Sequence, residues 1–157
     1  MGYAGLFLCL LPFLADTSRR REGPYLSVGG RGAVTLPSGD VLIAGGSSTA
    51  GNLRSTELFN PRTEVWISST DLDVARDYHE VIPLPDGRVM ALGGYSSNHT
   101  TSTEVYDPIT SRWISTGELP LARAGIAALP LRDGRVYAVG GYNHNDNYLA
   151  NVELYEP

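Results

Sequence analysis

The chain has 157 residues, of which 42% are apolar, and this composition is typical of a globular protein and not of a disordered one. Its formal net charge of −5 gives no positive field to attract phosphate backbones or anionic lipid, so we expect no nucleic-acid partner. The 18 glycines and 10 prolines favour many short strands joined by turns, and the predicted fold class is therefore all-β.

Residues 1–24 are predicted to be an N-terminal segment outside the fold. The stretch "MGYAGLFLCLLPFLA" contains an apolar run of about ten residues, whereas a helix that spans a bilayer needs about 20, so we expect no stable membrane span. The run is either a signal h-region, which would imply an extracellular or periplasmic location, or the product of a mis-called start. The arginines of "SRRRE" follow the run instead of preceding it, which argues against a cleaved signal. The single cysteine, Cys9, has no internal disulfide partner.

One phrase occurs three times, as "LPSGDVLIAGGS" from Leu36, "LPDGRVMALGGY" from Leu84 and "LRDGRVYAVGGY" from Leu131. A fixed long period indicates a stacked or circular array of similar units. Each copy places a turn dipeptide between apolar runs, which predicts a β-hairpin with a two-residue turn. The predicted turns are Ser38-Gly39, Asp86-Gly87 and Asp133-Gly134.

The two arms of this hairpin differ in composition. The arm after the turn is continuously apolar, which predicts a strand buried on both faces. The arm before the turn carries Pro83 or Pro130, and proline cannot donate to a ladder, so this arm is predicted to be an edge strand. A double glycine and a polar loop follow the buried arm in each copy.

A second hairpin follows each polar loop. In the first two copies an aromatic residue stands seven residues before Trp66 or Trp113, and the turns between them contain Asn60-Pro61 and Asp107-Pro108. Asx followed by proline is favoured at the first two positions of a type I turn. Each period therefore supplies four short antiparallel strands, which is the composition of a propeller blade.

These landmarks together resemble kelch repeats: the double glycine after four hydrophobic residues, the spaced aromatic and tryptophan, the "DG" hairpin, and Ala75-Arg76 and Ala122-Arg123 before the edge strand. The resemblance implies a partial kelch-type β-propeller in residues 25–157, with four-stranded antiparallel blades near 31–68, 76–116 and 123–157, the last one incomplete. Kelch propellers usually have six or seven blades, so we expect this chain to be a fragment, or alternatively to close a ring by self-assembly. An open stack of three blades exposes two apolar end faces.

Recognition is predicted in the loops after the double glycines, because they vary on a repeated scaffold. Their aromatic and polar side chains suit contact with a protein or a carbohydrate, and the alternative is a solvated loop. Two arginines before the edge strands either satisfy backbone carbonyls of the neighbouring blade or face an anionic ligand. The candidate partner-binding residues are Tyr95, Asn98, His99, Tyr142, His144, Asp146, Tyr148, Arg76 and Arg123.

We expect no catalytic residues, metal or cofactor. His99, His144 and Asp146 lie on different blades at unmatched offsets from their glycines, which argues against a metal site. Trp66 and Trp113 are interpreted as packing residues between blades. The glutamates that recur in one register, Glu57, Glu104 and Glu153, are interpreted as turn or ladder partners, and His79 as a packed or channel-lining residue.

The predicted function is a kelch-repeat binding or scaffold module. The alternative, implied only by the resemblance, is a fragment of a galactose-oxidase-like or sugar-mutarotase enzyme whose site lies in missing blades. The oxidase site needs a cysteine cross-linked to a tyrosine together with histidine ligands, and Cys9 lies outside the repeats. A third reading is a fragment without an independent function.

Overall fold

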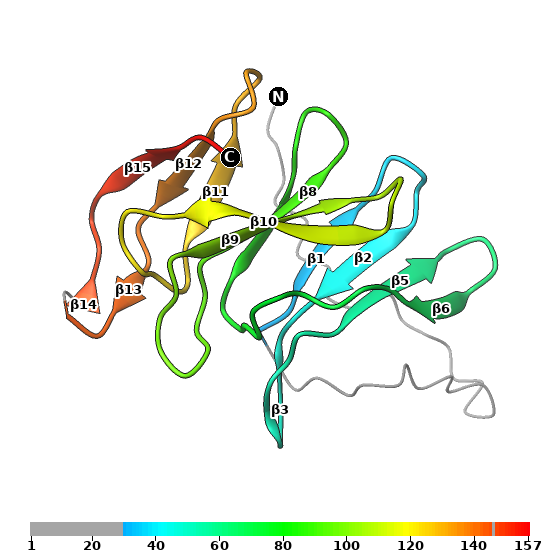
Figure 1. Cartoon of the computed structure of the whole chain (residues 1–157), viewed down its shortest axis with the longest axis horizontal. Coiled ribbons are helices and arrows are strands. Elements are labelled where there is room, and N and C mark those ends of the chain that lie inside the picture. Colours follow the sequence, from blue (N-terminus) through cyan, green and yellow to red (C-terminus); the bar gives the residue numbers. More distant parts are fainter. Residues whose placement is uncertain (1–29, 146) are drawn as a thin grey trace, which may run out of the picture.

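The structure is a computed structural model that describes residues 30–145 and 147–157. Within these residues every regular element is a β-strand, as the composition predicted. Figure 1 shows three main antiparallel sheets side by side, coloured blue to blue-green, green to yellow, and orange to red along the chain. The sheets form part of a kelch-type propeller and do not close into a ring.

Each main sheet is built from one repeat. The first has the order β1-β2-β5-β6, with bounds Gly32–Thr35, Val41–Ala44, Thr56–Asn60 and Val65–Ser68. The second has the order β7-β8-β9-β10, with bounds Glu80–Pro83, Val89–Leu92, Ser102–Asp107 and Arg112–Glu118. The third has the order β11-β12-β15, with bounds Ala127–Pro130, Val136–Val139 and Val152–Tyr155. Two short hairpins that the sequence did not predict are β3 (Ser47–Ser48) with β4 (Gly51–Asn52), and β13 (Tyr142–Asn143) with β14 (Asn147–Tyr148).

The first hairpin turn of each repeat has three residues, so the prediction of two-residue turns was wrong. In the third copy, Leu131 N donates to Arg135 O at 2.7 Å and Gly134 N donates to Leu131 O at 3.1 Å. These bonds enclose Arg132, Asp133 and Gly134, and the glycine has a φ of 92°. A type I turn followed by a left-handed residue is the usual three-residue hairpin connection, and it fits "DG" as well as the two-residue turn does.

The second hairpin turns lie at the predicted positions, Asn60-Pro61 and Asp107-Pro108. The Oδ1 atom of Asn60 accepts from Arg62 N at 2.9 Å, and that of Asp107 accepts from Ile109 N at 2.8 Å. Each Asx side chain thus replaces a backbone acceptor at the start of the turn, which is why the residue before the proline is Asn or Asp.

The edge strands lie where the proline positions predicted them. β1, β7 and β11 each end their sheet, and β7 lies between β1 and β11 at the inner side of the assembly. All four residues of β8 are buried, as predicted, because the second sheet is covered on both faces. β2 and β12 bury only alternate residues, since each belongs to a sheet with one described neighbour.

Two apolar cores hold the sheets together. Leu42 and Ala44 of the first sheet pack with Val89 and Trp113 of the second, and Trp113 Nε1 donates to Thr56 Oγ1 at 3.0 Å. The packing role predicted for Trp113 is therefore confirmed. Trp66 is half-buried and packs against Phe59 of its own sheet, with ring centroids 4.8 Å apart.

The second core lies between the second and third sheets. It contains Met90, Leu92, Val136 and Ala138, together with Tyr155, whose hydroxyl lies 2.7 Å from Thr103 Oγ1. In both cores a threonine of one sheet meets a polar atom on an aromatic ring of the next. Burial of that polar atom is therefore compensated by a hydrogen bond.

No helix of the described residues is long and apolar enough to cross a membrane. The apolar N-terminal run and Cys9 lie outside the described residues.

Candidate functional site

The loops that follow the three double glycines leave the sheets at one common edge, the lower edge in Figure 1, where β3, β13 and β14 are labelled. This edge, called the loop edge below, is formed by residues 45–55, 93–101, 140–145 and 147–151. The repeat explains the arrangement, because strands β2, β8 and β12 run in the same direction and end at equivalent positions.

The double glycines allow consecutive sheets to approach each other closely. Gly94 has a φ of 102°, and its N–H donates to Arg123 O at 2.8 Å. A Cβ at Gly94 would lie 2.7 Å from the carbonyl oxygen of Asp77, which leaves no room for a side chain. Glycine is thus required at this position for two reasons: its backbone is left-handed, and the backbone of Asp77 lies too close for a side chain.

Four aromatic rings from two sheets meet at the loop edge. The ring centroid of His99 lies 5.2 Å from that of Tyr95, 4.9 Å from that of His144 and 5.3 Å from that of Tyr142, each pair edge-to-face. Edge-to-face geometry is favoured between aromatic rings. The structure therefore brings four of the predicted site residues into one group, called the ring cluster below.

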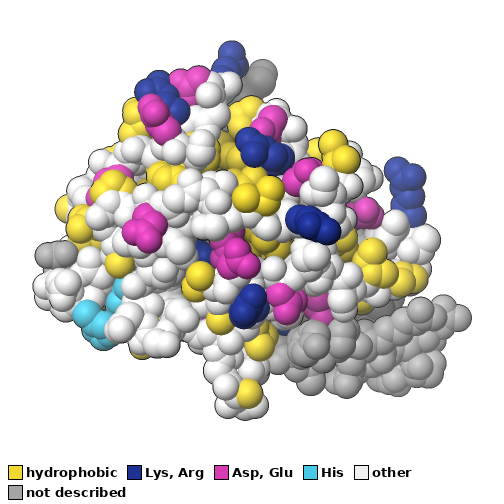
Figure 2. Space-filling model, viewed as in Figure 1, with side chains coloured by type: hydrophobic (Ala, Val, Ile, Leu, Met, Phe, Trp, Pro, Cys, Tyr) yellow, Lys and Arg dark blue, Asp and Glu magenta, His cyan; other side chains and the backbone are white. Residues whose placement is uncertain are grey.

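Figure 2 shows histidine side chains at one margin of the surface, at the lower left. Burial, together with the nearby His144, lowers the pKa of the His99 imidazole, so that this ring is neutral at pH 7. Burial also raises the pKa of the Tyr142 hydroxyl, with Tyr78 and Asp77 adding to the effect. The His99 imidazole and the Tyr142 hydroxyl of the ring cluster are thus both uncharged near neutral pH.

Two shallow depressions flank the ring cluster. One, of about 220 Å³, is lined by His99, His144 and the predicted residue Asn98, among others. The other, of about 260 Å³, is lined by Tyr142, Asn143, Asn147 and Tyr148. Tyr148 is 88% exposed. The remaining predicted loop residue, Asp146, lies outside the described residues.

Asn52 was not predicted, and it fastens two loops of this edge. Its Nδ2 atom donates to Tyr95 O at 2.7 Å and to Ser96 O at 3.1 Å, which ties the β3–β4 hairpin of the first sheet to the loop after β8. The loop sequences do not repeat, so no periodic signal marks this residue.

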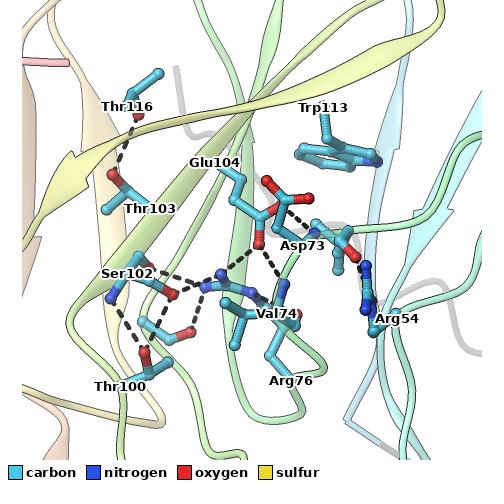
Figure 3. A network of polar contacts seen from close by, with 12 residues as sticks. Arg54, Asp73, Val74, Arg76, Thr100, Ser102, Thr103, Glu104, Trp113 and Thr116 are labelled. Atoms are coloured by element: carbon cyan, nitrogen blue, oxygen red, sulfur yellow. Dashed lines mark hydrogen bonds and ion pairs between the residues drawn. The ribbon is translucent and has the colours of Figure 1, made fainter.

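Arg76 lies in the interior, where Figure 3 shows its guanidinium surrounded by acceptors. Its Nη1 atom donates to Gly93 O and Ser102 O, both at 2.9 Å, and its Nη2 atom donates to Glu104 Oε1 at 2.6 Å. Glu104 also accepts from the backbone N–H groups of Asp73 and Val74. Burial lowers the pKa of Arg76, and the charge of Glu104 opposes that shift.

Arg123 repeats this arrangement in the third sheet. It is fully buried, its Nη1 donates to Gly140 O at 3.0 Å, and its Nη2 lies 2.6 Å from Glu153 Oε1. In the first sheet, Arg31 pairs with Glu57 at 3.0 Å. The recurring glutamates are thus partners of buried or half-buried arginines. The matched positions of Arg76 and Arg123 before β7 and β11 could have indicated the two interior pairs, whereas Arg31 stands at a different position, directly before β1.

Neither Arg76 nor Arg123 is accessible to a partner in this structure. The sequence left two roles open for these arginines, hydrogen bonding to carbonyls of the neighbouring blade or contact with an anionic ligand. Both side chains do donate to backbone carbonyls, but these carbonyls belong to the arginine's own sheet and not to the neighbouring one. The contact between sheets comes from the arginine backbone, since Gly46 N donates to Arg76 O and Gly94 N donates to Arg123 O, both at 2.8 Å.

His79 is buried between the first and second sheets. A Cβ at Gly45 would lie 2.7 Å from its Cε1 atom, and its Cβ lies close to Gly94. Neither ring nitrogen has a well-formed hydrogen bond. Burial, and then the charge of Arg76, lowers the pKa of His79 to about 3, so the imidazole is neutral in the folded chain.

Among the described residues no group of three or more His, Cys, Asp or Glu side chains is arranged to hold a metal ion. At the opposite edge of the sheets a hollow of about 610 Å³ lies between the turns of the second and third repeats. The arginines Arg88 and Arg135 in its lining are paired with Asp86 and Asp133, so their charges are compensated.

Comparison with known proteins adds two findings. A family model, the kelch motif, matches residues 84–120, which include β8, β9 and β10. Two galactose oxidase sequences of Gibberella zeae are each 32% identical to the chain over 57 residues, which is 36% of this chain and 8% of theirs. The match thus spans a small part of those relatives.

Proposed function

We propose that this chain, a kelch-repeat protein with galactose-oxidase-like similarity, binds a protein partner through the loop edge of its propeller sheets. The observation that carries the proposal is the ring cluster, in which side chains from two repeats gather at one edge. Aromatic side chains are enriched at the centres of protein interfaces because they bury a large area and keep a polar tip.

The loop edge also has the rigidity that a binding surface needs. The side chain of Arg76 holds the ends of β8 and β9 together, and Asn52 ties the first loop to the second. Loops that are ordered before binding lose less conformational entropy when the partner docks. The exposed ring of Tyr148 then offers contact area at a small entropic cost.

Carbohydrate is the second candidate partner. The depression between Tyr142 and Tyr148 is bordered by the amides of Asn143 and Asn147. An aromatic face packs against the apolar side of a sugar ring, and amides both donate to and accept from its hydroxyls. A glycan array probed with the labelled chain distinguishes this candidate from a protein partner.

An enzymatic role is the remaining alternative, and it rests on the similarity to galactose oxidase over 57 residues. It predicts that the chain, in its full-length context, oxidises galactose. An assay for hydrogen peroxide with galactose as substrate tests it directly.

The protein-binding proposal is tested by placing a photo-crosslinking amino acid at Tyr148 or, as a control, at Ile109. Both positions are highly exposed, at 88% and 94%, but Ile109 lies in the β9–β10 turn and away from the loop edge. We expect specific crosslinks to a discrete protein from position 148 only. With that protein purified, Tyr148→Ala should weaken binding about tenfold or more, and Ile109→Ala should not. Equal crosslinking from both positions would contradict the proposal.

A further inference from the structure

The structure brings together two histidines that the sequence places on different repeats. His99 follows β8 in the second sheet, and His144 lies in the β13–β14 hairpin of the third. Their ring centroids are 4.9 Å apart and their planes meet at 88°. The unmatched offsets from the glycines, which in the sequence argued against a metal site, do not determine where two neighbouring loops meet.

This separation fits two imidazoles bound to one metal ion. With Zn–N bonds of about 2.0–2.1 Å and tetrahedral angles, the centroids of two coordinating rings lie about 5 Å apart. Imidazole nitrogen is also a preferred ligand of divalent zinc, nickel and copper.

One ring nitrogen of His99 is available to bind a metal ion. The Nε2 atom of His99 is buried and has no hydrogen-bond partner, although buried polar atoms are almost always paired. Both histidines line the depression of about 220 Å³, together with the amides of Asn98, Asn143 and Asn145.

We infer that His99 and His144 form a binding site for a divalent transition-metal ion of the zinc class, held between the loops of the second and third sheets. Since the described residues supply no third His, Cys, Asp or Glu to this group, water or a donor from a bound molecule completes the coordination. The bound ion links the two loops and stabilises the folded chain by mass action. The inference does not depend on the proposed partner, because the site uses side chains of this chain alone.

The test uses the untagged full chain and the metal alone as the probe. Titration with Zn²⁺ in a calorimeter should show one ion per chain, and Co²⁺ should give the visible absorption bands of a nitrogen-bound ion. His144→Gln, at an exposed position, should weaken Zn²⁺ binding about tenfold or more, and His99→Gln should do the same. His79→Ile removes the chain's remaining histidine, which is buried and makes none of the ring contacts of the cluster, and should leave binding unchanged.

Folding of each variant is checked by circular dichroism, and the rise in Tm on adding Zn²⁺ gives a second readout for every variant that folds. The inference is overturned if the wild-type chain shows no saturable Zn²⁺ binding up to millimolar metal. It is equally overturned if His144→Gln, correctly folded, binds Zn²⁺ as the wild type does.

Discussion

The guanidinium of Arg76 and the carboxylate of Glu104 lie 2.6 Å apart, and both side chains are buried. Arg88 and Asp86 form an ion pair with the same 2.6 Å separation, but about half of each of these side chains is exposed. The two pairs therefore differ in burial and not in distance, and they allow the effect of burial to be measured within one chain.

We expect Glu104→Gln to lower the free energy of unfolding by at least about 3 kcal/mol, because it leaves the buried charge of Arg76 unpaired. The matched change Asp86→Asn should cost less than about 1 kcal/mol, since water already solvates that pair. Urea unfolding followed by circular dichroism measures both variants. A similar loss in the two variants would show that Arg76 and Glu104 do not act as a buried ion pair.

His79 makes the stability depend on pH. Its pKa is about 3 in the folded chain and near 6.5 when unfolded, so the unfolded chain binds the proton first as the pH falls. Stability should thus be unaffected by His79 above about pH 6.5 and should decrease from there towards pH 3, by up to about 1.4 kcal/mol per pH unit.

The variant His79→Ile should remove the part of this slope that comes from His79, since Ile126 occupies the equivalent position one repeat later, and should leave the part that comes from the lowered pKa of His99. Unfolding is best compared between pH 6.5 and pH 5, above the range in which most carboxylates titrate. If the two proteins lose stability in parallel over that range, His79 is not the group responsible.

A comparison of Gly94→Ala with Gly134→Ala distinguishes the stability cost of a steric clash from the cost of a strained backbone. Both glycines have a positive φ, of 102° and 92°, so each substitution strains the backbone. A Cβ at Gly94 would lie 2.7 Å from Asp77 O and 2.8 Å from the Cβ of His79, whereas one at Gly134 meets nothing within 4 Å. We expect Gly94→Ala to cost about 1–3 kcal/mol more than Gly134→Ala, measured by thermal unfolding. Equal costs would mean that the segment Asp77–His79 moves away from Gly94 without loss of stability.

The third sheet has an exposed apolar face that matches a buried face of the second. Leu129, Tyr137 and Leu154 lie side by side across β11, β12 and β15 and are 58%, 37% and 40% exposed. The corresponding residues of the second sheet, Ile82, Met90 and Val105, are 4%, 0% and 2% exposed because the third sheet covers them.

A contiguous apolar face of this kind promotes association in water. We expect the isolated chain to bind a hydrophobic dye and to self-associate as its concentration rises, measured by fluorescence and analytical ultracentrifugation. Leu129→Glu should reduce both effects. Ile109→Glu, which changes an isolated exposed residue, should leave them unchanged. If Leu129→Glu does not change the association, the chains associate through a different surface.

The sequence alone determined the repeating unit, because each strand and turn is specified by local chemistry. Proline at the end of β7 marks an edge strand, the apolar run of β8 marks a buried one, and Asp107 marks a turn through its own side chain. The predicted length of the "DG" turn was wrong, since two-residue and three-residue hairpins both use a glycine with positive φ.

Only the tertiary structure decided which side chains meet. The pairing of Arg76 with Glu104 joins the segment before β7 to β9, and the contact of His99 with His144 joins two sheets. A period fixes the position of a residue within its own repeat, but the contact between neighbouring loops depends on their individual lengths and conformations, which do not repeat. The scaffold was therefore readable from the sequence, whereas the composition of the candidate site followed from the packing of the sheets.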